Sequence, residues 1–331
     1  MRKVRPFAAL VLLLLLSGSC TGDRPDKAVL FRTADTDIAT RSLLSASGIE
    51  TKKTCITLAA YEDGSLVTSA HFTSRLDAMT MTLESGVSYT VYALVNMGDM
   101  RSELPASESG LSALTYLIPS YTSGKTSLAS RGLPMAGKLD YNGKTSVIPV
   151  ERLLAKVTAH LTCEWEGAAF REVKVCNLNR VLRPFGTGEA TGAQDILDEQ
   201  EFQDGTGTAS GTFVFYVPEN CQGSMPGITS SSGKSPDKSS AVAAVRDRLT
   251  YLEAVVDASG PYKGSIIYRS YLGKDAVSDF DILRNTHYIW KVRYLQNGLQ
   301  YDDWKHENDL LDPSGMEIDG EWDDGGESEL H

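Results

Sequence analysis

The sequence of 331 residues contains no hydrophobic run long enough to cross a bilayer, which takes about 20 apolar residues. The apolar run at residues 7–16 has ten. Basic residues are fewer than acidic ones: the chain has 32 Lys and Arg and 43 Asp and Glu, which gives a net charge of -11. Nucleic acids and anionic lipids both select basic surfaces, so neither is an expected partner. The 12 prolines and 29 glycines follow no strict period, which excludes a collagen-like chain.

Cysteine is scarce, and its spacing fits no metal site. The five cysteines form no C-x-x-C pair, so we expect no zinc site. Cys20 stands apart near the N-terminus. Of the other four, Cys55, Cys163 and Cys176 lie in apolar, strand-like runs, and Cys221 does not. A thiol in such a run packs as a small hydrophobic group, so we expect buried free thiols, with disulfides as the alternative.

The motifs of common catalytic and cofactor sites are absent as well. Three Gly-Lys-Ser/Thr tripeptides, at residues 124–126, 143–145 and 233–235, lack the upstream glycine of a phosphate-binding loop. No G-x-S-x-G elbow and no H-E-x-x-H pair occurs. Carboxylates are plentiful, but the sequence does not pair two of them across a cleft. We therefore predict that the protein is not an enzyme and has no catalytic residue, no metal site and no cofactor.

The N-terminus has the order of an export signal. Basic residues precede the apolar run, and small residues at 17–19 lead directly to Cys20. This order resembles a bacterial lipoprotein signal, in which the cysteine is acylated and becomes the first residue of the mature chain. We interpret residues 1–19 as a lipoprotein signal peptide and Cys20 as the lipidation site. A plain secretory signal with an incidental cysteine is the alternative.

Apolar and polar residues alternate through the rest of the chain, and helical periodicity is scarce. Met79–Leu83 alternates strictly, and Asp63-Gly64 is a hairpin turn signal. The first half shows about seven strands, the number in a small sandwich, and the second half repeats the pattern. We predict an all-β protein of two tandem β-sandwiches, residues 42–166 and 167–301, with few short helices. Residues 222–240, rich in Gly, Ser, Pro and Lys, predict a flexible surface loop.

Several short segments of the chain occur in one recognisable order. They are Thr54–Gly64, Tyr89–Asn96, Leu133–Gly137, Glu151–Val157, Phe215–Asn220, Tyr271–Gly273 and Asp279–Asn285 with Tyr288. In this order they resemble the fimbrillin family, the lipoprotein precursors of Bacteroides-type (type V) pili. The resemblance implies transthyretin-like sandwiches, an outer membrane lipoprotein at the cell surface, and a role in building or anchoring a fimbria. The alternative is that these segments are strand cores of an unrelated two-sandwich protein.

The resemblance also implies assembly by donor-strand exchange. In that family a cut after an arginine removes the first strand, and a strand of the next subunit fills the groove. Ala28–Phe31 resembles the removable strand, and Arg41-Ser42 lies in a small, polar stretch suited to cleavage. Residues 20–41 are then a lipid-proximal propeptide, or a linker if the chain stays uncut. Arg24 and Arg32 are alternative cleavage points.

The excess of acid is concentrated at the C-terminus. Residues 302–331 hold 12 acidic residues and one lysine, whereas residues 20–301 hold 31 acidic and 28 basic residues. Within this acidic tail, Met316, Ile318 and Trp322 alternate onto one face. We expect such a strand to have little to pair with in its own domain, which makes it a candidate donor strand. A solvated tail is the alternative.

Together these patterns predict a non-enzymatic fimbrial subunit. Its expected partners are other fimbrial subunits, through strand addition, and the outer membrane, through acylated Cys20. If Arg41 is uncut, the alternative is a lipid-retained anchor or accessory protein. A further alternative is a surface lipoprotein that binds a glycan or a host protein. That function calls for an exposed aromatic platform. Tyr262 and Tyr268 are an even number of residues apart, so on one unbroken strand they would lie on the same face.

Overall fold

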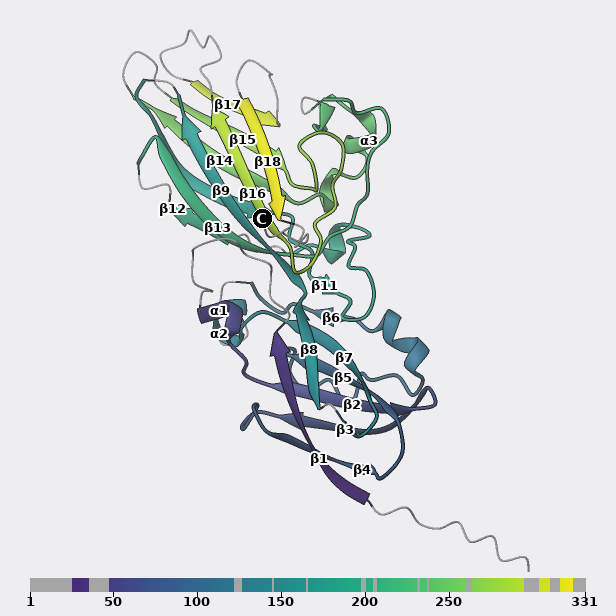
Figure 1. Ribbon diagram of the computed structural model, residues 1–331. Helices are drawn as coiled ribbons and strands as arrows, with labels where there is room; N and C mark the ends of the chain where they lie inside the picture. The colour runs from purple at the N-terminus through teal and green to yellow at the C-terminus, as the bar shows by residue number, and fades with distance from the viewer. Residues whose placement is uncertain are drawn as a thin grey trace, which may run out of the picture.

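β-Strands form most of the regular structure, and they divide into two sandwiches stacked end to end (Figure 1). The computed structural model describes residues 26–35, 48–121, 127–144, 146–164, 166–197, 201–204, 207–230, 233–236, 238–259, 264–294, 304–309 and 316–323. The prediction of an all-β chain with two tandem β-sandwiches is confirmed.

The first sandwich is one seven-stranded sheet folded into two layers, in the order β3-β2-β5-β7-β8-β1-β4. Its strands are β1 (Asp26–Asp35), β2 (Ile56–Glu62), β3 (Ser65–Phe72), β4 (Met79–Glu84), β5 (Tyr89–Val95), β7 (Met135–Tyr141) and β8 (Val147–Arg152). The fold in the sheet falls between β7 and β8, which pair only at Met135–Arg152 and Ala136–Glu151 among the described residues. The alternating apolar residues of both layers face one another and form the core of this sandwich.

The second sandwich consists of a five-stranded sheet, β12-β10-β14-β15-β17, and a four-stranded sheet, β13-β9-β16-β18. Its strands are β9 (Leu154–Cys163), β10 (Ala168–Cys176), β12 (Glu201–Asp204), β13 (Ser210–Pro218), β14 (Tyr251–Ala258), β15 (Gly264–Tyr271), β16 (His287–Tyr294), β17 (Trp304–Asp309) and β18 (Met316–Asp323). Most pairs are antiparallel, but β16 lies parallel to β9 and β17 parallel to β15. Such parallel neighbours join segments that are far apart in the sequence.

The helices of the described residues are short, as predicted. They are α1 (Gly48–Thr51), η1 (Glu108–Ala113), α2 (Leu128–Arg131), η2 (Ala193–Asp195), α3 (Ser240–Ala243) and η4 (Arg246–Arg248). A small two-stranded sheet joins β6 (Tyr116–Leu117) of the first half to β11 (Val181–Leu182) of the second. This sheet is one of several contacts that tie the two halves together.

The boundary predicted near residue 167 lies one strand too late. The structure places β9 in the second sandwich, where Thr158 pairs with Val214 of β13 and with Ile289 of β16. Leu153 alone separates β8 from β9, and it is buried. Because no glycine, proline or polar linker marks the crossing, the local pattern continues unbroken from one sandwich into the next.

A buried ion-pair network also joins the halves. Glu50 on α1 accepts hydrogen bonds from Lys156 Nζ at 2.9 Å and from the Tyr216 hydroxyl at 2.6 Å. The Arg152 guanidinium donates to the Glu50 carbonyl at 3.1 Å. Burial acts to raise the pKa of Glu50, but the hydrogen bonds from Tyr216 and Lys156 outweigh it and lower the pKa. The carboxylate is therefore charged, and it fixes α1 against two strands of the second sandwich.

The segment predicted as a flexible loop at residues 222–240 instead packs against the second sandwich where the structure describes it. Lys234 is fully buried, and its ammonium donates to the backbone carbonyls of Asp275 at 2.7 Å and Asp279 at 2.6 Å. The same ammonium lies 4.7 Å from the centroid of the Phe280 ring. Burial lowers the pKa of Lys234 to about 7, against the opposing effect of Asp275 and Asp279.

This burial predicts that Lys234 makes stability depend on pH. In the unfolded chain a lysine has a pKa of about 10.4, so between pH 7 and 9 the unfolded state binds more protons than the folded state. Stability therefore rises with pH in this window, by about 2 kcal/mol relative to a Lys234→Met variant. Chemical denaturation of both chains at pH 7, 8 and 9 measures the difference. Lys144→Met, at an exposed lysine, is the control. If the difference in unfolding free energy between wild type and Lys234→Met were as independent of pH as that for Lys144→Met, the prediction would be contradicted.

Candidate functional site

The first strand of the chain is an integral part of the first sandwich. Val29 and Phe31 of β1 are 7% and 0% exposed, whereas Leu30 between them is 42% exposed. This alternation follows from the period of a strand, which turns successive side chains to opposite faces. Phe31 packs edge-on against Tyr141, with ring centroids 5.3 Å apart. The predicted strand at residues 28–31 therefore contributes to the hydrophobic core.

β1 lies between two other strands and hydrogen-bonds to a different one at each end. Its first part pairs antiparallel with β4, from Asp26–Glu84 to Phe31–Met79. Its last part pairs parallel with β8, from Arg32–Val147 to Asp35–Val150. In Figure 1, β1 is the purple arrow that crosses the layer between these two strands.

Loss of β1 would leave a groove with a defined chemistry. The side chains of Met79, Met81, Ile148 and Val150, all buried at 3% or less, belong to the core that Val29 and Phe31 complete. The backbone groups of β4 and β8 that now pair with β1 would be left without partners, and unpaired strand edges accept a new strand readily. The vacated space would select an extended segment with apolar side chains at alternate positions.

Two of the predicted sites lie outside the described residues. They are the lipidation site, Cys20, and the cleavage point, Arg41-Ser42. The cleavage point falls in the chain between the end of β1 at Asp35 and the start of α1 at Gly48.

The aromatic platform considered for ligand binding does not form on Tyr268. Tyr268 is 1% exposed and its ring lies 4.4 Å from that of Tyr294, so it belongs to the core. Tyr262 lies outside the described residues. The alternation of side chains along the strand predicted which residues share a face with Tyr268. It does not indicate which face of the sheet the opposite layer covers.

The candidate donor strand has a partner within its own domain. β18 pairs antiparallel with β16 over eight residues, and Met316, Ile318 and Trp322 stand opposite Tyr294, Val292 and Tyr288. Figure 1 shows β18 in yellow at the edge of this sheet. The expectation that this strand has little to pair with is wrong. The alternation of residues 316–322 predicts a strand but does not specify which strand it pairs with.

The cysteine side chains that the structure describes are free thiols, and Cys55, Cys163 and Cys176 are buried. Burial raises the pKa of Cys163 and of Cys176 to about 12, so neither forms a reactive thiolate near neutral pH.

Across the described ranges, no group of three or more His, Cys, Asp or Glu residues could hold a metal ion. In the same part of the chain, no helix is both long and apolar enough to cross a membrane.

Solved structures share this architecture over nearly the whole chain. The tip fimbrial protein Mfa3 of Porphyromonas gingivalis, with a C-terminal truncation, matches with a TM-score of 0.56 at 12% identity, covering 91% of this chain and 100% of that one. A fimbrilin, FimA, of P. gingivalis W83 matches with a TM-score of 0.51 at 14% identity, covering 89% and 96%. The chain has the fimbrillin fold. A candidate cell adhesion protein from Bacteroides eggerthii shares that fold, with a TM-score of 0.56, 13% identity and coverage of 91% and 96%.

At the level of sequence the matches are narrower. Residues 215–292, which run from β13 to β16, match a domain of unknown function, DUF4906. No sequence among the curated proteins matches the chain. The resemblance to fimbrillins that the ordered segments indicated is confirmed for the fold, and at these low identities the fimbrillin fold is what the solved structures show.

Proposed function

We propose that the protein is a non-enzymatic fimbrial subunit, exported as a lipoprotein through Cys20 and assembled by donor-strand exchange. The observation that carries the proposal is the position of β1. It is the first described strand of the chain, it lies inside a layer of the first sandwich, and it supplies Val29 and Phe31 to the core. The fimbrillin fold shared with Mfa3 and FimA supports the same assignment.

Cleavage after Arg41 would separate β1 from the rest of the chain. The removed strand would then be held by sheet hydrogen bonds and by its buried side chains alone, with no covalent tie. The remaining chain would stay in place, because Glu50 on α1 is bound to Lys156 and Tyr216 of the second sandwich. A subunit cut in this way keeps its fold and gains an open groove.

β18 is the donor strand that we propose for the groove of the next subunit. It stands at an edge of its sheet and pairs with β16 alone within the described structure, so donation requires it to exchange that one partner for the strands of the groove. Its sequence alternates apolar Met316, Ile318 and Trp322 with acidic residues. The groove left by β1 needs that alternation, since one face of the incoming strand enters the core and the other faces solvent.

The proposal is tested by limited digestion with an Arg-specific protease, followed by N-terminal sequencing and size measurement. We expect the wild-type chain to begin at Ser42 and to form polymers. An Arg41→Ala variant should stay monomeric, and a chain without residues 312–331 should be cut but should not polymerise. Arg75→Ala, at an exposed arginine, is the control and should behave as wild type.

Two outcomes would contradict parts of the proposal. Unchanged polymers from the chain without residues 312–331 would exclude β18 as the donor. An acylated Cys20 that persists on surface-exposed protein, with Arg41 uncut, would instead support a lipid-retained anchor or accessory protein.

A further inference from the structure

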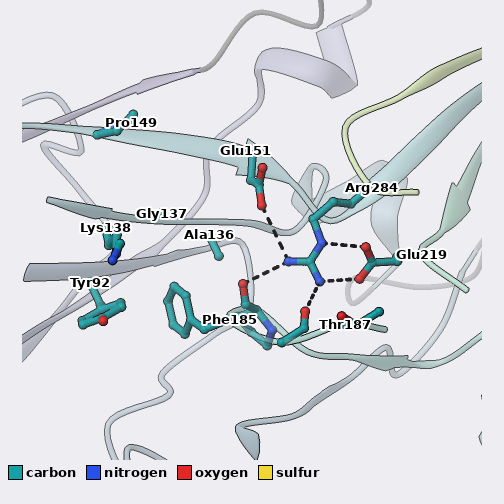
Figure 2. A pocket seen from close by; sticks show the side chains of 12 residues that line it. Tyr92, Ala136, Gly137, Lys138, Pro149, Glu151, Phe185, Thr187, Glu219 and Arg284 are labelled. Atoms are coloured by element: carbon teal, nitrogen blue, oxygen red, sulfur yellow. Dashed lines mark hydrogen bonds and ion pairs between the residues drawn. The ribbon is translucent and has the colours of Figure 1, made fainter. Parts of the chain in front are cut away.

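A cleft of about 630 Å³ opens where the two sandwiches meet (Figure 2). Its walls come from β5, β7 and β8 of the first sandwich and from the segment at residues 184–187 of the second half. The volume lies within the usual range of small-molecule sites. None of its lining residues belongs to β1 or β18, although Pro149 in the lining lies on β8 and pairs with Ala34 of β1.

At the back of the cleft, Arg284 is held by hydrogen bonds and an ion pair within the protein. Arg284 donates from Nε to Glu219 at 2.9 Å and from Nη1 to the Pro184 carbonyl at 3.0 Å, and Nη2 also contacts Glu219. Nη2 donates to the Arg183 carbonyl at 2.9 Å as well. Figure 2 shows the guanidinium turned toward Glu219, with Glu151 on its other side. Because its donors are already in use, Arg284 shapes the cleft and offers little to an anionic ligand.

Three other side chains in the lining have hydrogen-bonding capacity to spare. Lys138 and Thr187 are exposed, and their side chains make no hydrogen bond or ion pair within the described structure. The Glu151 carboxylate stands 3.7 Å from Arg284, too far for a hydrogen bond. Burial raises the pKa of Glu151, Arg284 opposes the shift, and Glu219 adds to it. The cleft therefore presents an ammonium, a hydroxyl and an incompletely solvated carboxyl group.

An aromatic pair forms another side of the cleft. The rings of Tyr92 and Phe185 meet edge-on, with centroids 4.8 Å apart, and both line the cleft (Figure 2). The same two rings also border a second hollow, of about 510 Å³, whose rim includes Ser107, Glu108 and Ser109. Phe185 thus stands between two hollows with polar rims. The electron-rich face of such a ring attracts the C–H groups of a bound molecule.

We propose that this cleft binds a neutral saccharide of one or two pyranose rings. A sugar ring presents C–H groups to an aromatic face while its hydroxyls both donate and accept hydrogen bonds. Phe185 supplies the face, Glu151 accepts from hydroxyls, and Lys138 and Thr187 donate to them. The cleft offers one ammonium, on Lys138, and one carboxyl group, on Glu151, so its available charges balance and a neutral ligand meets no unopposed charge.

Saturation-transfer NMR on the full exported chain tests the site. The probes are lactose, maltose, chitobiose and mannobiose, with 3′-sialyllactose as the acidic comparison. We expect at least one neutral disaccharide to receive saturation. Its affinity should fall about tenfold in Glu151→Gln, which replaces a charged acceptor by a neutral amide, and about tenfold in Phe185→Leu, which removes the aromatic ring. Lys144→Ala, at an exposed lysine outside the cleft, should bind as wild type.

The same experiment can overturn the proposal. Saturation of none of the neutral probes, or a preference for 3′-sialyllactose, would exclude a neutral-saccharide site. Unchanged affinity in both Glu151→Gln and Phe185→Leu would place any binding elsewhere on the protein. Thr187→Val removes one hydroxyl at an exposed position of the lining. It should therefore lower saccharide affinity without disturbing the core. Failure of strand exchange would leave all these outcomes unaffected.

Discussion

Replacing Phe31 with alanine is expected to lower the free energy of unfolding of the uncut chain by about 3–5 kcal/mol. Phe31 is fully buried, and its ring packs against Tyr141 in the core of the first sandwich. Truncation removes apolar contact and leaves a cavity that the surrounding strands fill incompletely. Denaturation in guanidinium, followed by tyrosine and tryptophan fluorescence, measures the loss.

The neighbouring residue on the same strand provides a matched control. Leu30 is 42% exposed, so Leu30→Ala should change the free energy of unfolding by no more than about 0.5 kcal/mol. Once cleavage at Arg41 and exchange have released β1, both variants should have the stability of the wild-type chain without β1. Equal losses from Phe31→Ala and Leu30→Ala in the uncut chain would show that β1 does not contribute its inward face to the core.

Replacing Arg284 with methionine is expected to cost about 3–5 kcal/mol of unfolding free energy. Glu219 is 5% exposed, and without the guanidinium it would remain as a buried carboxylate with no cation beside it. The Arg183 and Pro184 carbonyls would lose a donor as well. Arg284 also stands 3.7 Å from Glu151 of the first sandwich, so the variant should loosen the two sandwiches relative to each other as well. Denaturation and hydrogen exchange at residues 183–188 measure both effects.

Two further variants separate the loss of a buried pair from the loss of an arginine. Arg293→Met breaks an exposed pair with Glu164, whose side chains are 49% and 37% exposed, and should change stability little. A double change, Arg284→Met with Glu219→Gln, removes the stranded charge and should recover part of the loss. If Arg284→Met were no more costly than Arg293→Met, the ion pair at the junction would not stabilise the fold.

Much of the local structure followed from the sequence pattern. Met79–Leu83 alternates strictly and forms β4, and Asp63-Gly64 turns the chain between β2 and β3, with both residues at positive φ. Ala28–Phe31 was recognisable as a strand for the same reason. These features depend on neighbouring residues and on backbone geometry, so they can be predicted without knowledge of the rest of the fold.

The pairing of strands that are far apart in the sequence was harder to predict. β9 continues the apolar pattern of β8, yet it belongs to the second sandwich. β18 looked unpartnered, because its place beside β16 depends on an edge that the sequence does not mark. Lys234 lies in a stretch of turn-forming residues, which predicted a solvated loop, but tertiary packing buries it against Phe280.

No pattern in the sequence predicted the cleft between the two sandwiches. Glu151 and Arg284 lie within segments that resemble fimbrillins, but nothing in their spacing indicated that they would meet. Phe185 and Tyr92 come from different halves of the chain. A composite site of this kind has no local pattern, because its members are brought together by the packing of one domain on the other.

By itself, the sequence determined the all-β class, the alternation that turns Phe31 inward and the order of segments that resembles a fimbrillin. These depend on the two-residue period of a strand and on short-range turn geometry. The tertiary structure alone decided which strands are neighbours, that β1 lies within a layer, that β18 has a partner, and that a cleft forms at the junction. Each of these depends on contacts between residues far apart in the chain, which no local pattern specifies.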